Sequence, residues 1–308
     1  MQANAGSTLH VVTPLTNFSA GTLMGGSYVV YGSGGSPGRI QVDIFGTTGG
    51  EITTNAATIA LHGLNASLVD QNGNNALSAV AFNSGTLSVT DGANFQDTAA
   101  TFTNIGTVVI GAPDDFSAGP YLQTAGTTQD DGTLAASVTV NGGLFEGSGI
   151  VTGNLISNSG TTVKPGDSPG VLTINGNYTE AAGATLQIDI GGLLAGSQYG
   201  VLNLLGDATF NGILKLVDVN GFWFPGGESD FFIADYANRS GQFTSIDMSA
   251  MNLPSDYRFY FFYDQGSDHN QLEVEVFSPE PATYFGIAGA LAMFWLGAAI
   301  RKRKTLSC

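Results

Sequence analysis

Cysteine is nearly absent from this 308-residue sequence, which contains only Cys308 at its last position. One cysteine excludes an intrachain disulfide framework and a zinc site built from cysteine thiolates. Basic residues are also scarce, because 9 Lys and Arg stand against 25 Asp and Glu, and the formal net charge is −16. Only 5 of these basic residues, and no basic patch, occur in residues 1–278. Binding to nucleic acid needs such a patch for the phosphates, so nucleic acid is excluded as a partner.

Charge of either sign is sparse, since charged residues make up 11% of the chain against roughly 25% in typical soluble domains. The 44 glycines follow no strict period, which excludes a collagen helix. Hydrophobic residues reach 43%, which excludes a wholly disordered chain. A mean hydropathy of +0.14 with so little charge favours β structure that faces water through Ser, Thr, Asn and Gly.

An uncharged run of 19 residues lies near the C-terminus, at 282–300. As a helix it would be about 28 Å long, close to the ~30 Å hydrocarbon core of a bilayer. Four basic residues follow it directly: Arg301, Lys302, Arg303 and Lys304. Such a tail is typical of the cytoplasmic end of a transmembrane helix, and it places residues 1–278 outside the cytoplasm. The alternative is a buried core helix, which rarely ends on four consecutive cations.

The tripeptide Pro279-Glu280-Pro281 immediately precedes this run. Two prolines can simply end a strand and delay a helix. Together with the span and the basic tail, however, the tripeptide resembles the PEP-CTERM sorting signal of Gram-negative bacteria, over residues 279–304. The resemblance implies an exported protein that an exosortase, its membrane-embedded partner, processes near the tripeptide. It also implies transient anchoring in the inner membrane, then a cell-surface or extracellular location, often in species that make biofilm exopolysaccharide.

Export also needs a secretory signal peptide, and residues 1–7 contain neither its basic nor its apolar segment. The segment Ala3-Asn4-Ala5 does fit the A-x-A pattern of a signal-peptidase site. We therefore expect the chain to begin inside the end of a signal peptide that belongs to a longer precursor. The alternative is a chance match in an alanine-rich start.

Short β-type segments separated by Gly and Asn fill the rest of the sequence. Gly-Thr pairs recur about every 20 residues, at Gly85-Thr86, Gly106-Thr107 and Gly126-Thr127. Imperfect repeats of this length are typical of a parallel β-solenoid, in which each coil buries its apolar side against the next. The alternative for residues 80–190 is a β-sandwich with evenly spaced strands.

A second sequence repeat (the second echo), with a longer spacing, relates Val138-Thr-Val-Asn-Gly142 to Leu172-Thr-Ile-Asn-Gly176. In a solenoid, the apolar residues of both segments should point inward: Val138, Val140, Leu172 and Ile174.

The same part of the chain carries a second resemblance, over roughly residues 120–215. Its Gly, Asn and Pro-Gly corners follow in the order Gly147-Ser-Gly149, Gly153-Asn154, Asn158-Ser-Gly160 and Lys164-Pro-Gly-Asp-Ser-Pro-Gly170. This order resembles the passenger repeats of autotransporters and related surface proteins. The resemblance implies a right-handed β-helix used in adhesion and surface display. The sorting signal takes the place of the autotransporter's membrane barrel, so self-translocation is not expected.

Four regions follow from these patterns: an N-terminal β region or early coils at 1–79, the solenoid at 80–191, an aromatic-rich β cap at 192–278, and the sorting signal at 279–304 with its transmembrane helix at 282–300. The cap is predicted because thirteen aromatic residues lie between Phe222 and Tyr263. A solenoid needs a cap over its last apolar layer, and bulky rings can supply it. An aromatic sugar-binding platform is the alternative.

No catalytic, cofactor-binding or metal-binding residue is predicted. Two segments match the Gly-x-Ser-x-Gly pattern of hydrolases, around Ser36 and Ser168, but proline follows the serine in both. Proline lacks the N–H that the oxyanion hole requires, so both segments are predicted to be turns. The three histidines, His10, His62 and His269, are far apart and not at ligand spacing.

Two acidic pairs, Asp114-Asp115 and Asp130-Asp131, stand next to Gly or Pro and are expected to be solvated turns. A Ca²⁺ site built from their oxygens is the alternative.

The sequence therefore predicts an exported structural or adhesion-type protein of the cell surface or extracellular matrix, and not an enzyme. Ladders of Ser, Thr and Asn would bind exopolysaccharide or other surface proteins. The alternative is an exported β-helix lyase or hydrolase that acts on polysaccharide, which needs carboxylates and basic residues clustered in one groove. The basic residues of the body are far apart in sequence: Arg39, Lys164, Lys215, Arg239 and Arg258.

The sorting signal gives a direct prediction. Replacement of Pro279, Glu280 and Pro281 by alanine should leave the body exported and the span inserted but the chain unprocessed, because the enzyme loses its extended recognition segment. Neutral residues at Arg301–Lys304 should weaken retention instead, since each cation costs about 2.5–3.5 kcal/mol to move into the membrane. Membrane and released fractions from a host with an exosortase measure both effects. Alanine at residues 305–307 is the matched control, and wild-type processing of the tripeptide variant would contradict the assignment.

Overall fold

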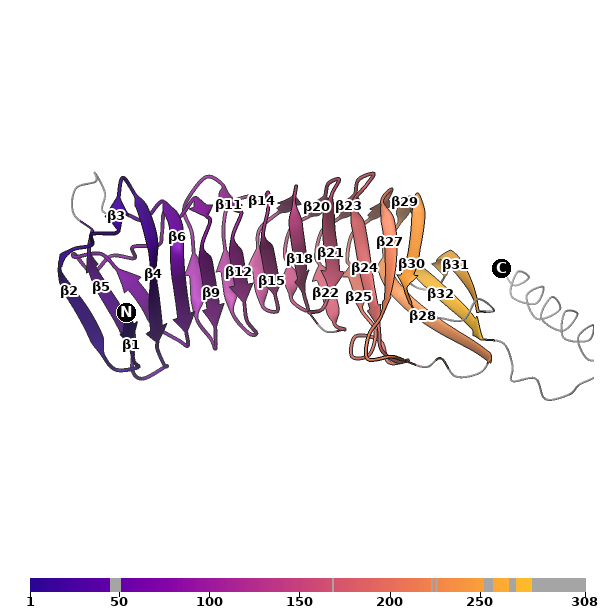
Figure 1. Cartoon of the computed structure of the whole chain (residues 1–308), viewed down its shortest axis with the longest axis horizontal. Helices are drawn as coiled ribbons and strands as arrows, with labels where there is room; N and C mark the ends of the chain where they lie inside the picture. Colours follow the sequence, from indigo (N-terminus) through magenta and orange to yellow (C-terminus); the bar gives the residue numbers. More distant parts are fainter. Residues whose placement is uncertain are drawn as a thin grey trace, which may run out of the picture.

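The computed structural model describes residues 1–44, 51–167, 169–222, 224, 227–251, 257–265 and 270–278. These residues form strands, turns and bends, and none of them is helical. Most strands are parallel and are stacked side by side along the long axis of the molecule, which gives the β-helix-like body in Figure 1. The predicted all-β, parallel architecture is thus confirmed, and the β-sandwich alternative for residues 80–190 is wrong.

The predicted sorting signal, residues 279–304 with Pro279, Glu280, Pro281, the 282–300 run and the tail Arg301–Lys304, lies outside the described residues. Among the residues that the structure describes, no helix is long and apolar enough to cross a membrane.

Each coil contributes three short strands, one to each of three parallel ladders. One coil consists of β11 (Phe102–Asn104), β12 (Thr107–Ile110) and β13 (Asp115–Ser117). These strands pair with β14 (Tyr121–Gln123), β15 (Thr127–Asp130) and β16 (Thr133–Ala135) of the next coil. Residues in each strand alternate between buried and exposed positions, so every coil places one set of side chains in the core and one set outside.

The remaining strands extend these ladders. The first ladder also contains β8 (Phe82–Asn83), β17 (Val138–Val140), β20 (Leu155–Ser157), β23 (Tyr178–Glu180), β26 (Ala208–Phe210) and β29 (Arg239–Gly241). The second also contains β9 (Thr86–Thr90), β18 (Gly143–Gly147), β21 (Thr161–Pro165), β24 (Thr185–Ile190), β27 (Ile213–Asp218) and β30 (Ser245–Ala250). The third also contains β10 (Asn94–Gln96), β19 (Ile150–Val151), β22 (Val171–Ile174), β25 (Val201–Leu204) and β28 (Gly227–Tyr236).

At the N-terminal end, β6 (Thr54–His62) is long enough to pair with both β8 and β9. It is preceded in the stack by β4 (Thr22–Tyr31), which pairs in parallel with β1 (Gln2–Ala3) and antiparallel with β3 (Phe18–Ser19). A separate parallel sheet contains β2 (Thr8–Pro14), β5 (Gly38–Asp43) and β7 (Ala66–Val69).

At the C-terminal end, parallel stacking continues beyond residue 192 as far as β28, β29 and β30. The antiparallel part begins where β32 (Asn270–Ser278) pairs with β28, and β31 (Arg258–Gln265) pairs with β32. Aromatic rings fill this end of the core. The ring centroids of Phe224 and Phe231 lie 5.7 Å apart in an edge-to-face arrangement, and those of Phe210 and Phe243 lie 4.7 Å apart. Region 192–278 thus contains both solenoid coils and an antiparallel meander.

The Gly-Thr repeat corresponds to real coils, because Thr107 lies in register between Thr86 and Thr127. Coil length then varies along the stack. It shortens where Leu144 stacks on Thr127, and it lengthens near the C-terminal end, where Ser245 stacks on Ile213.

The second echo has a different origin. Val138, Val140, Leu172 and Ile174 are all at most 1% exposed, which confirms that they point inward. Their strands do not stack on each other, however, because β17 lies between β14 and β20, whereas β22 lies between β19 and β25. Two sides of the solenoid carry similar segments because both require the same inward alternation before an Asn-Gly corner.

A row of buried amides runs through the N-terminal half of the stack: Asn55, Asn83, Asn104 and Gln123 are all 0% exposed. Nδ2 of Asn55 donates to Oδ1 of Asn83 at 2.7 Å, and Nδ2 of Asn83 donates to Oδ1 of Asn104 at 2.8 Å. Nδ2 of Asn83 also donates to the backbone carbonyl of Thr107 at 3.1 Å. An amide buried without such partners would be costly, so this row fixes the register of the adjacent Gly-Thr corners.

Glycine is required at those corners because the coils approach each other closely. A Cβ on Gly106 would lie 2.1 Å from the carbonyl oxygen of Gly85, and a Cβ on Gly126 would lie 2.0 Å from that of Gly106. Both clashes are with backbone, which cannot move without separating the paired strands.

Gly106→Ala should therefore destabilise the fold by about 3 kcal/mol, the upper end of the usual range for overpacking. Gly35→Ala is the matched control, because no atom lies within 4 Å of its Cβ position. Denaturant unfolding of both variants measures the effect. Equal stability of the two variants would mean that the coils do not stack closely at this corner.

Candidate functional site

The outer surface of the second ladder carries a threonine row, defined as Thr58, Thr86, Thr107, Thr127, Thr162 and Thr185. Consecutive members stack in register, with Leu144 between Thr127 and Thr162. The strand spacing of a parallel sheet places the stacked residues about 4.8 Å apart. The row is therefore a regular line of hydroxyls along the axis of the solenoid.

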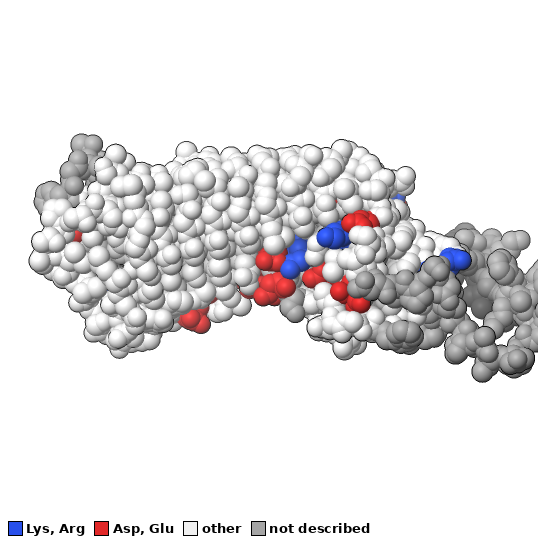
Figure 2. Space-filling view, in the orientation of Figure 1, with Lys and Arg blue, Asp and Glu red and all other residues white. Residues whose placement is uncertain are grey.

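The other two ladders also present mainly uncharged side chains. On the first ladder, the outward positions in register include Thr103, Thr139, Thr179 and Thr209, with Leu122 and Ile156 among them. On the third ladder, Thr133, Ile150, Thr173 and Asn203 succeed one another, with Asp115 before them and Asp235 after them in the same row. Figure 2 shows one face of the molecule, on which most of the charged side chains gather between the lower middle and the right of centre, while the upper part of the body is almost entirely uncharged.

One charged cluster lies where the second ladder turns toward the third. Lys164 Nζ lies 2.6 Å from Glu146 Oε2, and the two side chains are only 13% and 14% exposed. Nε2 of Gln129 donates to Asp131 at 2.7 Å and to Asp167 at 3.2 Å. The structure thus brings together a basic residue and three carboxylates that are separated in sequence.

This cluster resembles in composition what a polysaccharide-cleaving enzyme needs, but its groups are engaged with one another. The Lys164 ammonium binds Glu146 and the backbone carbonyl of Asp167. Asp131 accepts from the backbone N–H of Ser148 as well as from Gln129. Neither cavity described below includes these side chains.

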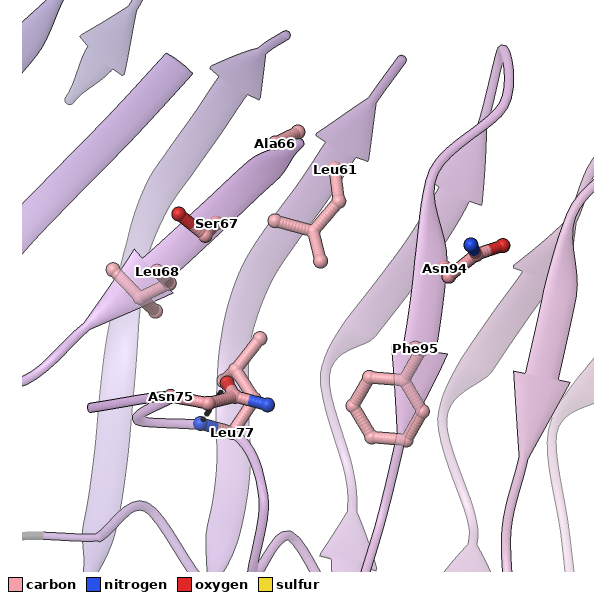
Figure 3. Close-up of a pocket in the computed structure, with 8 residues that line it drawn as sticks. All are labelled: Leu61, Ala66, Ser67, Leu68, Asn75, Leu77, Asn94 and Phe95. Carbon is pink, nitrogen blue, oxygen red and sulfur yellow. Dashed lines mark hydrogen bonds between the residues drawn. The ribbon is translucent and has the colours of Figure 1, made fainter. Parts of the chain in front are cut away.

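A cavity of about 200 Å³ lies where the third side of the stack is interrupted. Figure 3 shows its lining residues around the space between β7 and β10, which belong to different sheets. Leu61, Leu68, Leu77 and Phe95 are at most 3% exposed, and Asn75 Oδ1 accepts from the N–H of Leu77. Its lining contains no charged side chain, and its polar residues are Ser67, Asn75 and Asn94. We interpret it as a packing gap at a sheet boundary.

A second cavity, of about 260 Å³, lies on the outside of β23, β26 and β29. Its lining is almost entirely polar: Asn177, Thr179, Asp207, Ala208, Thr209, Asn238, Arg239 and Ser240. We call it the polar groove.

One acidic group could hold a metal ion by geometry alone. Carboxylate oxygens of Glu228, Asp230 and Glu275 lie within 4.8 Å of one another, on β28 and β32. Acidic groups of this kind are common without an ion, so the group carries no assignment.

Three acids are 0% exposed, Asp114, Asp130 and Glu180, and burial raises the pKa of each of them. Burial raises the pKa of Asp130 to about 8, although the nearby N–H groups of Gly132 and Leu134 favour its carboxylate. Neither carboxyl oxygen of Asp130 has a hydrogen bond of ordinary geometry. Burial also raises the pKa of Glu180 to about 8, and the N–H of Gly212 offsets only part of this. Asp130 and Glu180 are therefore mainly protonated at neutral pH.

The interpretation of the acidic pairs as solvated turns is wrong for one member of each pair. Asp114 and Asp130 are 0% exposed, whereas Asp115 and Asp131 reach the surface. The inward alternation of the coil places the first aspartate of each pair inside. The neighbouring Gly or Pro in the sequence does not reveal which aspartate of the pair points into the core.

The other sequence-predicted positions are dispersed. Ser36 lies in a tight turn with Ser33, as predicted, and Ser168 and His269 lie outside the described residues. His10 is exposed on β2. His62 stacks on Tyr31 with ring centroids 4.8 Å apart, and its Nδ1 lies 2.6 Å from the hydroxyl of Thr90.

The polar groove and the charged cluster were not predicted from the sequence. Their residues come from coils of unequal length, and only the structural register aligns them. The Asn177-Tyr-Thr179 and Asn238-Arg-Ser240 segments share an Asn-x-Thr/Ser pattern, which is the one sequence signal for the groove.

No protein-family model matches the sequence, and no curated protein matches it.

The raised pKa values of Asp130 and Glu180 predict that the free energy of unfolding falls as the pH rises. Between about pH 4 and pH 8 the unfolded chain has released the two protons, with ordinary pKa values of 3.8 and 4.5, while the folded protein keeps them. Each group should then lower the free energy of unfolding by up to about 1.4 kcal/mol per pH unit in this window.

Denaturant unfolding at pH 5, 6.5 and 8 measures this slope. Asp130→Asn and Glu180→Gln should each reduce it, and the double variant should reduce it further. A slope that is unchanged in the double variant would show that other groups cause the pH dependence.

Proposed function

We propose that this protein is an exported β-solenoid that acts as a structural or adhesive component of the cell surface or extracellular matrix, and that it is not an enzyme. The observation that carries the proposal is the set of in-register, uncharged rows on the outside, above all the threonine row on the second ladder. Regularly spaced hydroxyls can both donate and accept hydrogen bonds, which suits polysaccharide and the surfaces of neighbouring proteins.

Sorting by an exosortase completes the proposal. Pro279-Glu280-Pro281 would be the processing motif, the 282–300 run a transient inner-membrane helix, and Arg301–Lys304 the cytoplasmic stop. A right-handed sense of the β-helix, and capping of its end by the aromatic-rich antiparallel strands within residues 192–278, are further parts of this proposal. The four basic residues that directly follow the 282–300 run support this orientation, with residues 1–278 outside the cytoplasm.

The charged cluster around Lys164 supports the enzymatic alternative less well than the outward rows support the structural function. General acid–base catalysis needs a group that can reach a substrate proton. The Lys164 ammonium, only 13% exposed, is bound to Glu146, and neither of the two cavities described above is lined by either side chain. We therefore favour the structural function.

The threonine row provides the test. Thr86→Val, Thr107→Val and Thr127→Val in one variant keep the β-branched shape but remove three hydroxyls. If each makes one bond to a surface ligand at about 1 kcal/mol, binding should weaken by about 100-fold. The readout is the amount of purified protein, wild type or variant, that binds to cells of the producing species with the gene deleted.

A matched control replaces three exposed threonines outside the rows, Thr13, Thr101 and Thr124, with valine. This control should bind as the wild type does. Unchanged binding of the row variant, or equal loss in the control, would contradict a role for the row.

A further inference from the structure

The polar groove lies between two rows of side chains on the last three coils. A corner row contains Asn177, Asp207 and Asn238, which directly precede β23, β26 and β29. An outward row contains Thr179, Thr209 and Ser240, which occupy equivalent positions in those strands. Backbone between the two rows forms the floor, with the small side chain of Ala208 buried below it. Three coils at ~4.8 Å spacing give the groove a length of about 10 Å along the axis.

The corner row is held in place by its own hydrogen bonds. Oδ1 of Asn177 accepts from the backbone N–H of Asp207 at 2.9 Å. Oδ1 of Asp207 accepts from Nδ2 of Asn238, also at 2.9 Å. These contacts fix the side-chain rotamers, so little conformational entropy remains to be lost when a ligand binds.

The same contacts leave specific atoms without a protein partner among the described residues. These atoms are the Asn177 Nδ2 group, the second carboxylate oxygen of Asp207 and the Thr179 hydroxyl. Thr209 and Ser240 share one hydrogen bond at 2.9 Å and keep further lone pairs. Donors and acceptors thus face the groove within a few ångströms of each other.

Charge decides which class of ligand fits. The Arg239 guanidinium is occupied, because Nε and one terminal nitrogen bind Asp264 at 3.1 and 2.7 Å and the other binds the carbonyl of Gly241. It also lies over the ring of Tyr263, 4.5 Å from the centroid. Asp207 is then the charged group with a free atom in the groove, and it would repel an anionic ligand.

We propose that the polar groove is a binding site for a short, uncharged saccharide segment. Two adjacent sugar hydroxyls would bind across the corner row, one donating to the free Asp207 oxygen and the other accepting from Nδ2 of Asn177. The threonine and serine hydroxyls of the outward row would bind the opposite edge of the sugar. This inference rests on the proposed function as a surface protein and names one ligand class and one site for it.

Saturation-transfer NMR and calorimetry with the full chain test the proposal, with cellohexaose and mannohexaose as neutral probes and oligogalacturonate as the anionic probe. At least one neutral probe should bind, and oligogalacturonate should bind at least tenfold more weakly. Asp207→Ala should weaken binding of the neutral probe by about tenfold to a hundredfold, because it removes a charge-assisted hydrogen bond. Thr209→Val should weaken it less, and Thr103→Val, on the same ladder but several coils away, should not change it.

Absence of binding by both neutral probes, a preference for oligogalacturonate, or wild-type affinity in Asp207→Ala would each overturn the assignment. Circular dichroism and the unfolding midpoint show whether the variants keep the fold. If Asp207→Ala binds to cells as the wild type does while neither neutral probe binds, the groove assignment fails and the proposed function stands. If the wild type does not bind to cells at all, the proposed function fails independently of the groove.

Discussion

In-register parallel pairing between successive coils is the constraint on which the rest of this structure depends. Because strand residues lie directly on their counterparts in the next coil, the same residue type at one position of successive coils forms a continuous row along the axis. Inside, this produces the row of amides from Asn55 to Gln123; at the corners it produces stacked glycines such as Gly85 and Gly106. Outside, it produces the threonine row. Stability and surface chemistry therefore have one origin.

The same constraint explains the buried acids. The interior position that Gln123 occupies is taken by Val140, Ser157 and Glu180 in the following coils. The carboxyl of Glu180 therefore lies at the position of the amide row, but without a side-chain amide neighbour to bond it. Asp130 likewise pairs with Ile110, an apolar neighbour that cannot donate a hydrogen bond. A coil can hold such a group because protonation removes its charge. Asp130 and Glu180 thus lower the stability of the fold increasingly as the pH rises.

Much of the fold was predictable because the Gly-Thr repeat and the inward alternation are local signals, and Thr86, Thr107 and Thr127 do stack. The second echo was misleading as a stacking repeat, since Val138 and Leu172 lie on different ladders. The polar groove was not predictable: Asn177, Asp207 and Asn238 meet only because two long coils return to the same corner. The sorting signal at 279–304 stays a prediction from the sequence.

The central claim is that this solenoid works outside the cytoplasm after release from a C-terminal signal. Mass spectrometry of the C-terminal peptide, from cell-surface and secreted fractions of the producing organism, tests it most directly. The account predicts mature chains that end close to Pro279-Glu280-Pro281 and lack residues 282–308. Chains that still end at Cys308 in those fractions, or protein recovered only from the cytoplasm, would contradict it.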